Sequence, residues 1–390
     1  MSRATEVAPS SAVAAEGTSS GAARPVRLFL CGDVMTGRGV DQILPHPVDP
    51  RLFEPAARSA SEYVALAETA NGPIRRPVAF AYVWGDALAE LDRRRLDFRV
   101  INLETAVTRS EDAAPKGINY RMSPENFASI TAAGIDCCGL ANNHVLDWGP
   151  RGLIETLDTL RKAGVSATGA GRSTPEAALP AILARRDGTR VLVFAFGSET
   201  SGIPRGWAAT ETRPGVNLLP DMSLRTVRAI AQEIHAVKRP RDIVVASIHW
   251  GSNWGYDVPR SQRTFAHAII DEAGVDVVHG HSSHHPKAIE VYRRHLILHG
   301  CGDFLNDYEG IGGHEEFRSD LVIAYFPELS AASGDLLRLD MAPFRIRNFR
   351  LIRASRVDVE WLAQTLSRVS DRFGARVEAN GGATLTLRWR

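Results

Sequence analysis

Residues that can bind a metal ion or move a proton stand directly after several apolar, strand-like runs of this chain. Because parallel strands of an α/β sheet end at one edge, side chains that follow them can meet in a single site. Carboxylate, amide and imidazole ligands without a thiolate suit a reactive divalent cation better than a structural zinc ion. The pattern therefore predicts a metal-dependent enzyme. The residues, with the apolar run before each, are Asp33 (26–31), Glu104 (98–103), Asn143 and His144 (135–141), His249 (243–248), and His281 and His284 (275–278).

The densest group of imidazoles lies in the segment 278–286, which places four histidines within seven residues. We expect Gly280 to permit an unusual turn that lets His281 and His284 converge on one ion. The spacing alone leaves open which of the histidines bind. Single residues of the wider set are weaker evidence, since Asp33 by itself could close a turn and Glu104 could cap a helix.

Candidate proton carriers accompany the ligands. Asp147 stands three residues after His144, a spacing at which a carboxylate can orient an imidazole and raise its basicity; a turn of satisfied polar side chains is the alternative. Asp33 is a second candidate base. The segment 302–316 adds Tyr308 and His314, which could handle protons or form a hydrogen-bonded loop over a pocket. Candidate substrate-binding residues are Arg38, Arg121, Tyr308 and Arg318, the arginines as partners for a carboxylate.

Composition excludes several classes of protein. The 390 residues carry a formal net charge of +1 and are 44% hydrophobic, which allows a large core and predicts no nucleic-acid or membrane partner. The sequence contains no run of about 18 apolar residues, so we expect no membrane-spanning helix. The four cysteines lack a C-x-x-C spacing, so we expect buried free thiols and a cytoplasmic location. Residues 1–24 are rich in Ala, Ser and Gly and predict a disordered tail.

Strand-like and helix-like segments alternate along most of the chain. Helical spacing occurs at 84–94, 151–163, 220–237 and 262–273, each followed by a strand-like segment. Regular alternation of this kind predicts a layered α/β fold with helices on both faces. A hairpin at Arg293-Arg294 predicts a mixed sheet. We expect a single domain over 25–390, in which 334–390, read as two strands, a helix and a final strand, form a C-terminal elaboration.

These residues together resemble the CapA family, which acts in poly-γ-glutamate capsule synthesis and has a calcineurin-like metallophosphoesterase fold. The resemblance runs from about Val26 to Phe326. It is carried by Gly32-Asp33, Asn102-Leu103-Glu104-Thr105, Ala141-Asn142-Asn143-His144 with Asp147, His249-Trp250-Gly251, and Gly280-His281 with His284. It implies a sandwich of mixed sheets flanked by helices. It also implies a metal site of Asp33, Glu104 (bridging), Asn143, His249, His281 and His284, with His144 as the proton-transfer residue oriented by Asp147.

The resemblance departs from the family pattern in one place that matters for the metal. Metallophosphoesterases usually begin with Asp-x-His, in which both residues bind, but this chain has Asp33-Val34-Met35. A thioether is a poor ligand for a hard ion. We therefore expect one tightly bound divalent metal (Mn, Zn, Fe, Ca or Mg) and a second site that is weak or absent.

Two enzyme functions and one non-catalytic function follow from the predicted site. The lost ligand and the absence of a membrane anchor favour a metal-dependent peptide epimerase, similar to the enzymes that invert the C-terminal Cα of lasso-peptide precursors. The alternative is a phosphoesterase or related hydrolase of the CapA type, in which a metal activates water. The third reading is a binding protein on an enzyme-like scaffold. A peptide or a small anionic molecule is the expected substrate.

Overall fold

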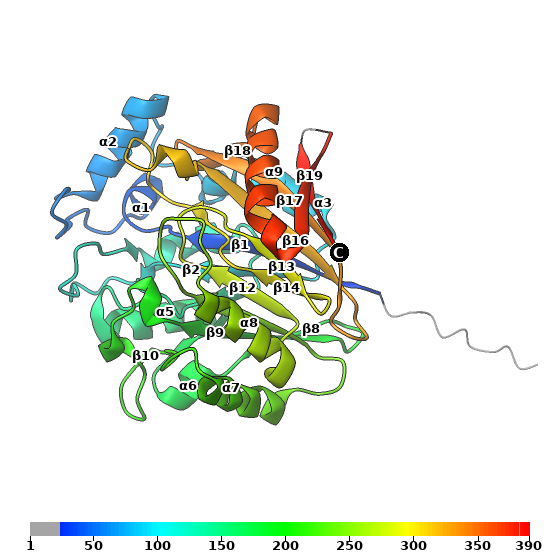
Figure 1. Ribbon diagram of the computed structural model, residues 1–390. Helices are drawn as coiled ribbons and strands as arrows, with labels where there is room; N and C mark the ends of the chain where they lie inside the picture. Colours follow the sequence, from blue (N-terminus) through cyan, green and yellow to red (C-terminus); the bar gives the residue numbers. More distant parts are fainter. Residues whose placement is uncertain (1–23, 382) are drawn as a thin grey trace, which may run out of the picture.

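The computed structural model describes residues 24–381 and 383–390. The tail predicted for residues 1–24 lies, apart from Arg24, outside the described residues. The chain forms two β-sheets that pack face to face and are flanked by helices (Figure 1), as the resemblance implied.

The larger sheet is mixed and contains the first strand of the chain near its centre. Its strand order is β19-β20-β17-β16-β1-β2-β5-β6, with β15 paired to β1 and β18 paired to β17. The β1–β2–β5–β6 part is parallel, and β16 runs antiparallel to β1. The strands are β1 (Val26–Val34), β2 (Phe98–Leu103), β5 (Cys137–Gly139), β6 (Ser166–Thr168), β15 (Asp303–Leu305), β16 (Leu321–Leu329), β17 (Leu336–Arg347), β18 (Arg350–Arg353), β19 (Ala375–Asn380) and β20 (Thr384–Trp389).

The second sheet has the order β13-β14-β12-β11-β9-β8, with antiparallel strands at both edges. Arg293 and Arg294 join β13 to β14 with φ angles of 49° and 72°, the positive values that a tight two-residue hairpin requires. The predicted hairpin and mixed sheet are confirmed. The strands are β8 (Ala181–Ala184), β9 (Arg190–Gly197), β11 (Ile243–His249), β12 (Val277–His281), β13 (Ile289–Tyr292) and β14 (His295–Leu298).

Alternation along β1 shows why the sheets form layers. Leu28 and Leu30 point into the core between the two sheets, whereas Phe29 and Cys31 point to the helices outside. Both faces are apolar, because a strand in the middle of a parallel sheet is covered on both sides. The helices are α1 (Gly39–Ile43), α2 (Ala60–Asn71), α3 (Asp86–Arg93), α4 (Ala128–Thr131), α5 (Gly149–Lys162), α6 (Thr174–Ala178), α7 (Leu224–Val237), α8 (Arg260–Ala273) and α9 (Arg356–Ser370).

Each outer face of the sandwich has its own covering helices. Helices α3 and α5 bury Leu91 and Leu153 against the larger sheet. Helices α7 and α8 cover the second sheet in the lower part of Figure 1, where Ile234 and Ile269 meet Phe194. Short strand pairs, β3 (Ala106–Val107) with β4 (Arg121–Met122) and β7 (Ala170–Gly171) with β10 (Gly215–Val216), brace the loops at the edge.

The C-terminal segment extends the larger sheet. Strand β17 pairs with β16, β20 pairs with β17, and α9 adds Leu362 and Leu366 to the core between the sheets. The expected order of two strands, a helix and one final strand omitted β19. Its side chains alternate between buried and exposed at its start and are exposed at its end, so the segment resembles a polar loop in the sequence.

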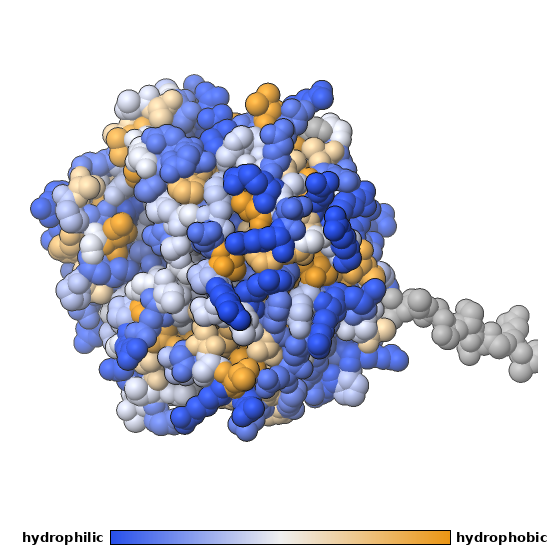
Figure 2. Space-filling view, in the orientation of Figure 1, coloured by the Kyte–Doolittle hydropathy of each residue, from blue (hydrophilic) through white to orange (hydrophobic). Residues whose placement is uncertain are grey.

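The surface and the cysteines agree with the composition. Apolar side chains on the face in Figure 2 occur in small groups between hydrophilic ones. The four cysteines are buried free thiols, as expected. Within the described ranges, every helix is too short or too polar to traverse a lipid bilayer.

Candidate metal centre

Asp33, His249 and His281 converge at the carboxyl ends of β1, β11 and β12, where the two sheets meet. Their ligand atoms all lie within 4.8 Å of one another, and all three side chains are buried. Asp33 Oδ1 is 3.4 Å from His281 Nδ1 and 3.9 Å from His249 Nδ1. The structure thus brings together three of the six predicted metal ligands from strands of two different sheets. It also places two more of them beside the other nitrogen of His249, whose Nε2 is 2.9 Å from Asn143 Oδ1 and 3.7 Å from Glu104 Oε1. That each of these residues binds a metal stays a prediction.

Close backbone packing holds this junction together. A Cβ on Gly32 would lie 1.7 Å from the carbonyl oxygen of Gly302, so only glycine fits before Asp33. Gly280 is also required for space, because its Cβ would lie 2.5 Å from the Leu298 carbonyl oxygen. The unusual turn predicted at Gly280 is wrong. Gly280 continues β12, and the positive φ of 103° falls on Ser282, whose amide donates to Asp33 Oδ2 at 3.0 Å.

A chain of hydrogen bonds through Ser247 links His281 to His279. His279 Nε2 donates to the Cys31 carbonyl oxygen at 2.6 Å, so its Nδ1 can accept from the Ser247 hydroxyl at 3.3 Å. With that hydroxyl proton directed to His279, the Ser247 oxygen accepts from His281 Nε2 at 2.8 Å. In this arrangement His281 Nδ1 carries a lone pair that faces Asp33 and His249, as a metal ligand requires.

The opposite ring faces the same point. His249 Nε2 lies 2.9 Å from the side-chain oxygen of Asn143, and a hydrogen bond donated to that oxygen leaves a lone pair on His249 Nδ1. The two Nδ1 atoms are 2.9 Å apart, so one can donate to the other when no ion is bound, and both can be ligands when an ion is bound. The donor set therefore fits a divalent metal ion held by Asp33, His249 and His281.

A second carboxylate reinforces the negative charge of the centre. Asn102 Nδ2 donates to Asp33 Oδ1 at 2.7 Å and to Glu104 Oε2 at 3.3 Å, which places both carboxylates side by side. Burial, reinforced by Asp303, raises the pKa of Asp33 to about 7. Burial and the charge of Asp33 raise the pKa of Glu104 as well. Carboxylates forced together in this way gain most from a bound cation.

His144 stands beside the centre in the orientation of a proton carrier. Its Nδ1 lies 2.6 Å from Asp147 Oδ2, while Nε2 points toward Glu104 Oε1 at 3.8 Å. Lys116 Nζ bonds the other oxygen of Asp147 at 2.7 Å, and Tyr120 packs edge-on against the imidazole. Burial, aided by Lys116, lowers the pKa of His144 to about 4, so the ring is neutral and has a lone pair at Nε2.

A second histidine–carboxylate pair lies on the other side of β1. His284 Nδ1 is 3.0 Å from Asp303 Oδ1, and Asp303 is aligned with Asp33 in the β1–β15 pairing. Burial opposes the charge of His284, but Asp303 outweighs it and raises the pKa of the ring. His284 is therefore placed next to the centre as a partner of Asp303, outside the three-residue cluster. Whether it also binds a metal stays a prediction.

The predicted arginines are occupied by groups of the protein itself. Arg38 is buried and binds Glu54 and Asp307, and its guanidinium lies 4.2 Å from the Tyr120 ring centre. Arg121 donates to the carbonyl oxygens of Ser110 and Asp49. Arg318 pairs with Asp320 and Asp358. Their guanidinium groups are thus engaged structurally, and a role in substrate binding stays a prediction.

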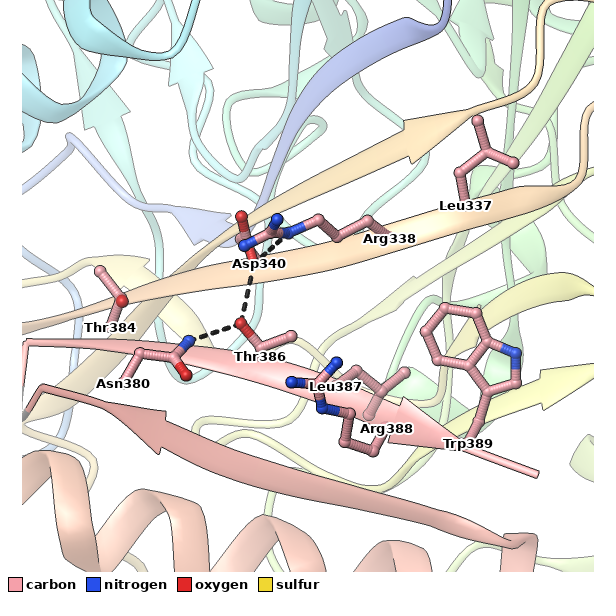
Figure 3. A pocket seen from close by; sticks show the side chains of 9 residues that line it. All are labelled: Leu337, Arg338, Asp340, Asn380, Thr384, Thr386, Leu387, Arg388 and Trp389. Atoms are coloured by element: carbon pink, nitrogen blue, oxygen red, sulfur yellow. Dashed lines mark hydrogen bonds and ion pairs between the residues drawn. The ribbon is translucent and has the colours of Figure 1, made fainter.

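A cavity of about 1060 Å³ opens beside His284, between α2 and the segment 306–320. Tyr308, His314 and Arg318 line it. The His314 ring stacks on Trp254 with their ring centres 3.9 Å apart. Both residues line the cavity, and His314 is not part of the three-residue cluster. A smaller cavity of about 520 Å³ on β17 and β20 (Figure 3) has its polar groups bonded together, through Asp340, Thr386 and Asn380.

Several residues of the site escaped prediction from the sequence. Ser247 lies inside an apolar strand, and only its place two positions before His249 could have revealed it. His279 was one of the four histidines considered as ligands, but its role as a neighbour of Ser247 was not predicted. Lys116 comes from an irregular loop and carried no recognisable signal. Asp303 belonged to a polar segment that was noticed but given no role.

The comparisons with known proteins agree with this geometry. Residues 27–308 match the family described as "Bacterial capsule synthesis protein PGA_cap", a metallophosphoesterase-like family, and this chain belongs to it. A "probable polyglutamine synthesis accessory protein" of Mycobacterium tuberculosis is 49% identical over 354 residues, covering 90% of this chain and 93% of the relative. The "Capsule biosynthesis protein CapA" of Bacillus anthracis is 25% identical over 285 residues, covering 72% of this chain and 59% of the relative. The "PGA biosynthesis protein CapA" of Bacillus subtilis is 31% identical over 216 residues, covering 55% and 54%. The predicted family is confirmed.

Proposed function

We propose that this chain is a metal-dependent hydrolase that cleaves an ester or amide bond of a peptide-type substrate. The observation that supports it is the junction of Asp33, His249 and His281 with the His144–Asp147 pair at its side. The names of the relatives concern capsule or polyglutamine synthesis, which favours the CapA-type hydrolase over the peptide epimerase.

The residues of the chain divide the work by position. Asp33 Oδ1, His249 Nδ1 and His281 Nδ1 would hold the ion, and Ser247 keeps His281 in the required tautomer. A divalent cation bound there would supply Lewis acidity and lower the pKa of a water molecule. His144 Nε2 can take a proton and return it to the leaving group, while Asp147 and Lys116 keep the ring aligned.

We propose one tightly held ion and a weaker second one. Met35 stands where the related enzymes have a histidine, and it is buried against the Tyr308 hydroxyl, with Sδ 3.6 Å from that oxygen. Glu104 and Asp303 provide carboxylates near Asp33 but add no imidazole. A second ion would therefore depend mainly on oxygen ligands, with His284 beside Asp303 as the one remaining imidazole, and bind more weakly.

The test is a panel of substrates that release nitrophenol or nitroaniline. Purified protein would be stripped with EDTA, reloaded with Mn²⁺ or Zn²⁺, and assayed on p-nitrophenyl phosphate, bis(p-nitrophenyl) phosphate and glutaminyl p-nitroanilide. His144→Ala should lower kcat by about 100-fold or more while metal content is unchanged. A metal-loaded protein that turns over none of these compounds would refute the hydrolase proposal.

One observation supports peptide epimerisation as a second candidate. The pairs His144–Asp147 and His284–Asp303 lie on opposite sides of β1, and inversion at a Cα needs two proton carriers on opposite faces. Incubation of a peptide with a free C-terminus in D₂O, with metal present, would be followed by mass spectrometry. Deuterium at the terminal Cα would support this function, and no incorporation would reject it.

A further inference from the structure

The cavity beside His284 has a chemistry of its own. In the part of the chain that the structure describes, Leu66, Ile118 and Ile311 are large apolar side chains that remain 40%, 43% and 51% exposed, and all three line this cavity. Apolar side chains gathered in one hollow mark a binding site more often than apolar residues scattered singly.

An aromatic wall connects this cavity with the metal centre. Trp254 stacks on His314, and its ring centre is 5.3 Å from that of His284. His284 in turn bonds Asp303, which is aligned with Asp33. A ligand that lies against Trp254 would therefore have one end beside the centre and the rest in the cavity.

The charges in the cavity are already balanced. Arg318 and Arg345 share Asp320, and Arg318 also binds Asp358. Arg38 is held between Glu54 and Asp307. The three arginines of the lining (Arg38, Arg318, Arg345) face four carboxylates (Glu62, Glu309, Glu315, Asp320), so the cavity has no surplus of fixed positive charge. A polyanion would lose its hydration there without gaining an unpaired cation.

Building on the proposed function, we infer that this cavity binds an uncharged peptide chain and directs one of its bonds to the metal centre. A volume of about 1060 Å³ is at the upper end of ordinary ligand sites and exceeds what a single amino acid needs. The apolar residues contact aliphatic parts of the chain, and the Trp254–His314 stack supports a flat peptide or amide group. Polyglutamate, which is fully ionised at neutral pH, is the substrate that this site disfavours.

The test measures binding without turnover. N-acetylated, C-amidated hexaglutamine and hexaglutamate would be titrated calorimetrically into the full chain in EDTA at physiological salt. Hexaglutamine should bind at least about 10-fold more tightly than hexaglutamate. Ile311→Glu and Ile118→Glu should each weaken hexaglutamine binding about 5-fold or more, whereas Ile182→Glu, on β8 and 47% exposed, should leave it unchanged.

Each outcome decides between the alternatives. Hexaglutamate that binds as tightly as hexaglutamine, binding that resists both cavity substitutions in folded variants, or no binding of either peptide would overturn the inference. Because the measurement needs no catalysis, failure of the hydrolase assay leaves its result intact, and a positive hydrolase assay with no peptide binding overturns the inference alone.

Discussion

The Glu290 group and the Asp33 group both combine histidines with a buried carboxylate, and they differ in what their imidazole nitrogens face. Around Glu290, His299 Nε2 donates to one carboxylate oxygen at 3.0 Å, and His267 and Arg263 donate to the other at 2.8 and 2.9 Å. Around Asp33, the Nδ1 atoms of His249 and His281 face each other and a carboxylate. The first group is an ion-pair cluster around one carboxylate, and the second has the donor set of a metal site.

The acidity of the carboxylates shows the same difference. Burial opposes ionisation of Glu290, but the hydrogen bonds from His299 and Arg263 outweigh it and lower its pKa to about 2. Burial raises the pKa of Asp33 to about 7, and the negative charge of Asp303 adds to this effect. Residue types alone therefore do not separate a structural ion-pair group from a metal site. The groups that the imidazole nitrogens face do.

Removal of a proposed ligand should have the largest effect on this contrast. His249→Ala takes one of three donors from the centre, and we expect metal affinity to fall about 1,000-fold, or about 4 kcal/mol. Competition with a fluorescent chelator measures it. His267→Ala, which removes an imidazole from the Glu290 group, should leave the affinity as it is. Equal losses in both variants would mean that the two groups are not different in kind.

Disruption of the Glu290 group should affect stability instead. Glu290→Gln leaves Arg263 and two histidines without their anionic acceptor, and we expect a loss of about 2 to 3 kcal/mol in the free energy of unfolding by urea. Metal affinity of the folded variant should match the parent protein. A stability loss near zero would show that Glu290 contributes no more than a surface charge.

The same carboxylate should produce a defined acid sensitivity. Its folded pKa of about 2 lies below the ordinary value of 4.5, so its contribution is present above pH 4.5 and is lost as the pH falls toward 2. Urea midpoints in EDTA at pH 6, 4.5 and 3 should fall more steeply for the parent chain than for Glu290→Gln. Parallel curves would argue against the assigned hydrogen bonds.

The tautomer relay should have an intermediate effect on metal binding. Ser247→Ala removes the acceptor for His281 Nε2–H, so the ring can flip its proton to Nδ1, and affinity should fall 10- to 100-fold. Ser247→Thr keeps the hydroxyl and should restore most of it. Ser370→Ala, which deletes another buried hydroxyl bonded to the Ile289 amide, controls for general loosening. An unaltered affinity in Ser247→Ala would remove the relay from the site.

The smallest change is expected from restoring the missing imidazole. Met35→His should strengthen the second, weaker ion by about 10-fold, since it adds a borderline ligand next to Asp33. Metal content after gel filtration, measured by mass spectrometry, should rise from near one toward two ions per chain. A content that stays at one would show that the second position lacks more than this ligand.

The fold and the three-residue cluster could be predicted from the sequence for a physical reason. Strands buried on both faces read as unbroken apolar runs, so the first polar residue after each run marks the carboxyl edge of a sheet. That logic found Asp33, His249 and His281. It could not find which polar residues inside a strand support them, because the pairing of Ser247 with His279 depends on register between neighbouring strands. It also could not show that Arg38 is occupied by Glu54 and Asp307, which lie far from it in the sequence.

The position of β1 has a consequence for synthesis on the ribosome. Strand β1 pairs with β15 and β16, which follow it by about 270 residues in the sequence. At about 5 to 20 residues per second, the strand waits roughly 15 to 60 seconds for these partners. An apolar strand with an open edge during that interval is exposed to chaperones and to aggregation. A chain truncated before residue 303 would keep Asn102 beside Asp33 but would lack Asp303 on its other side.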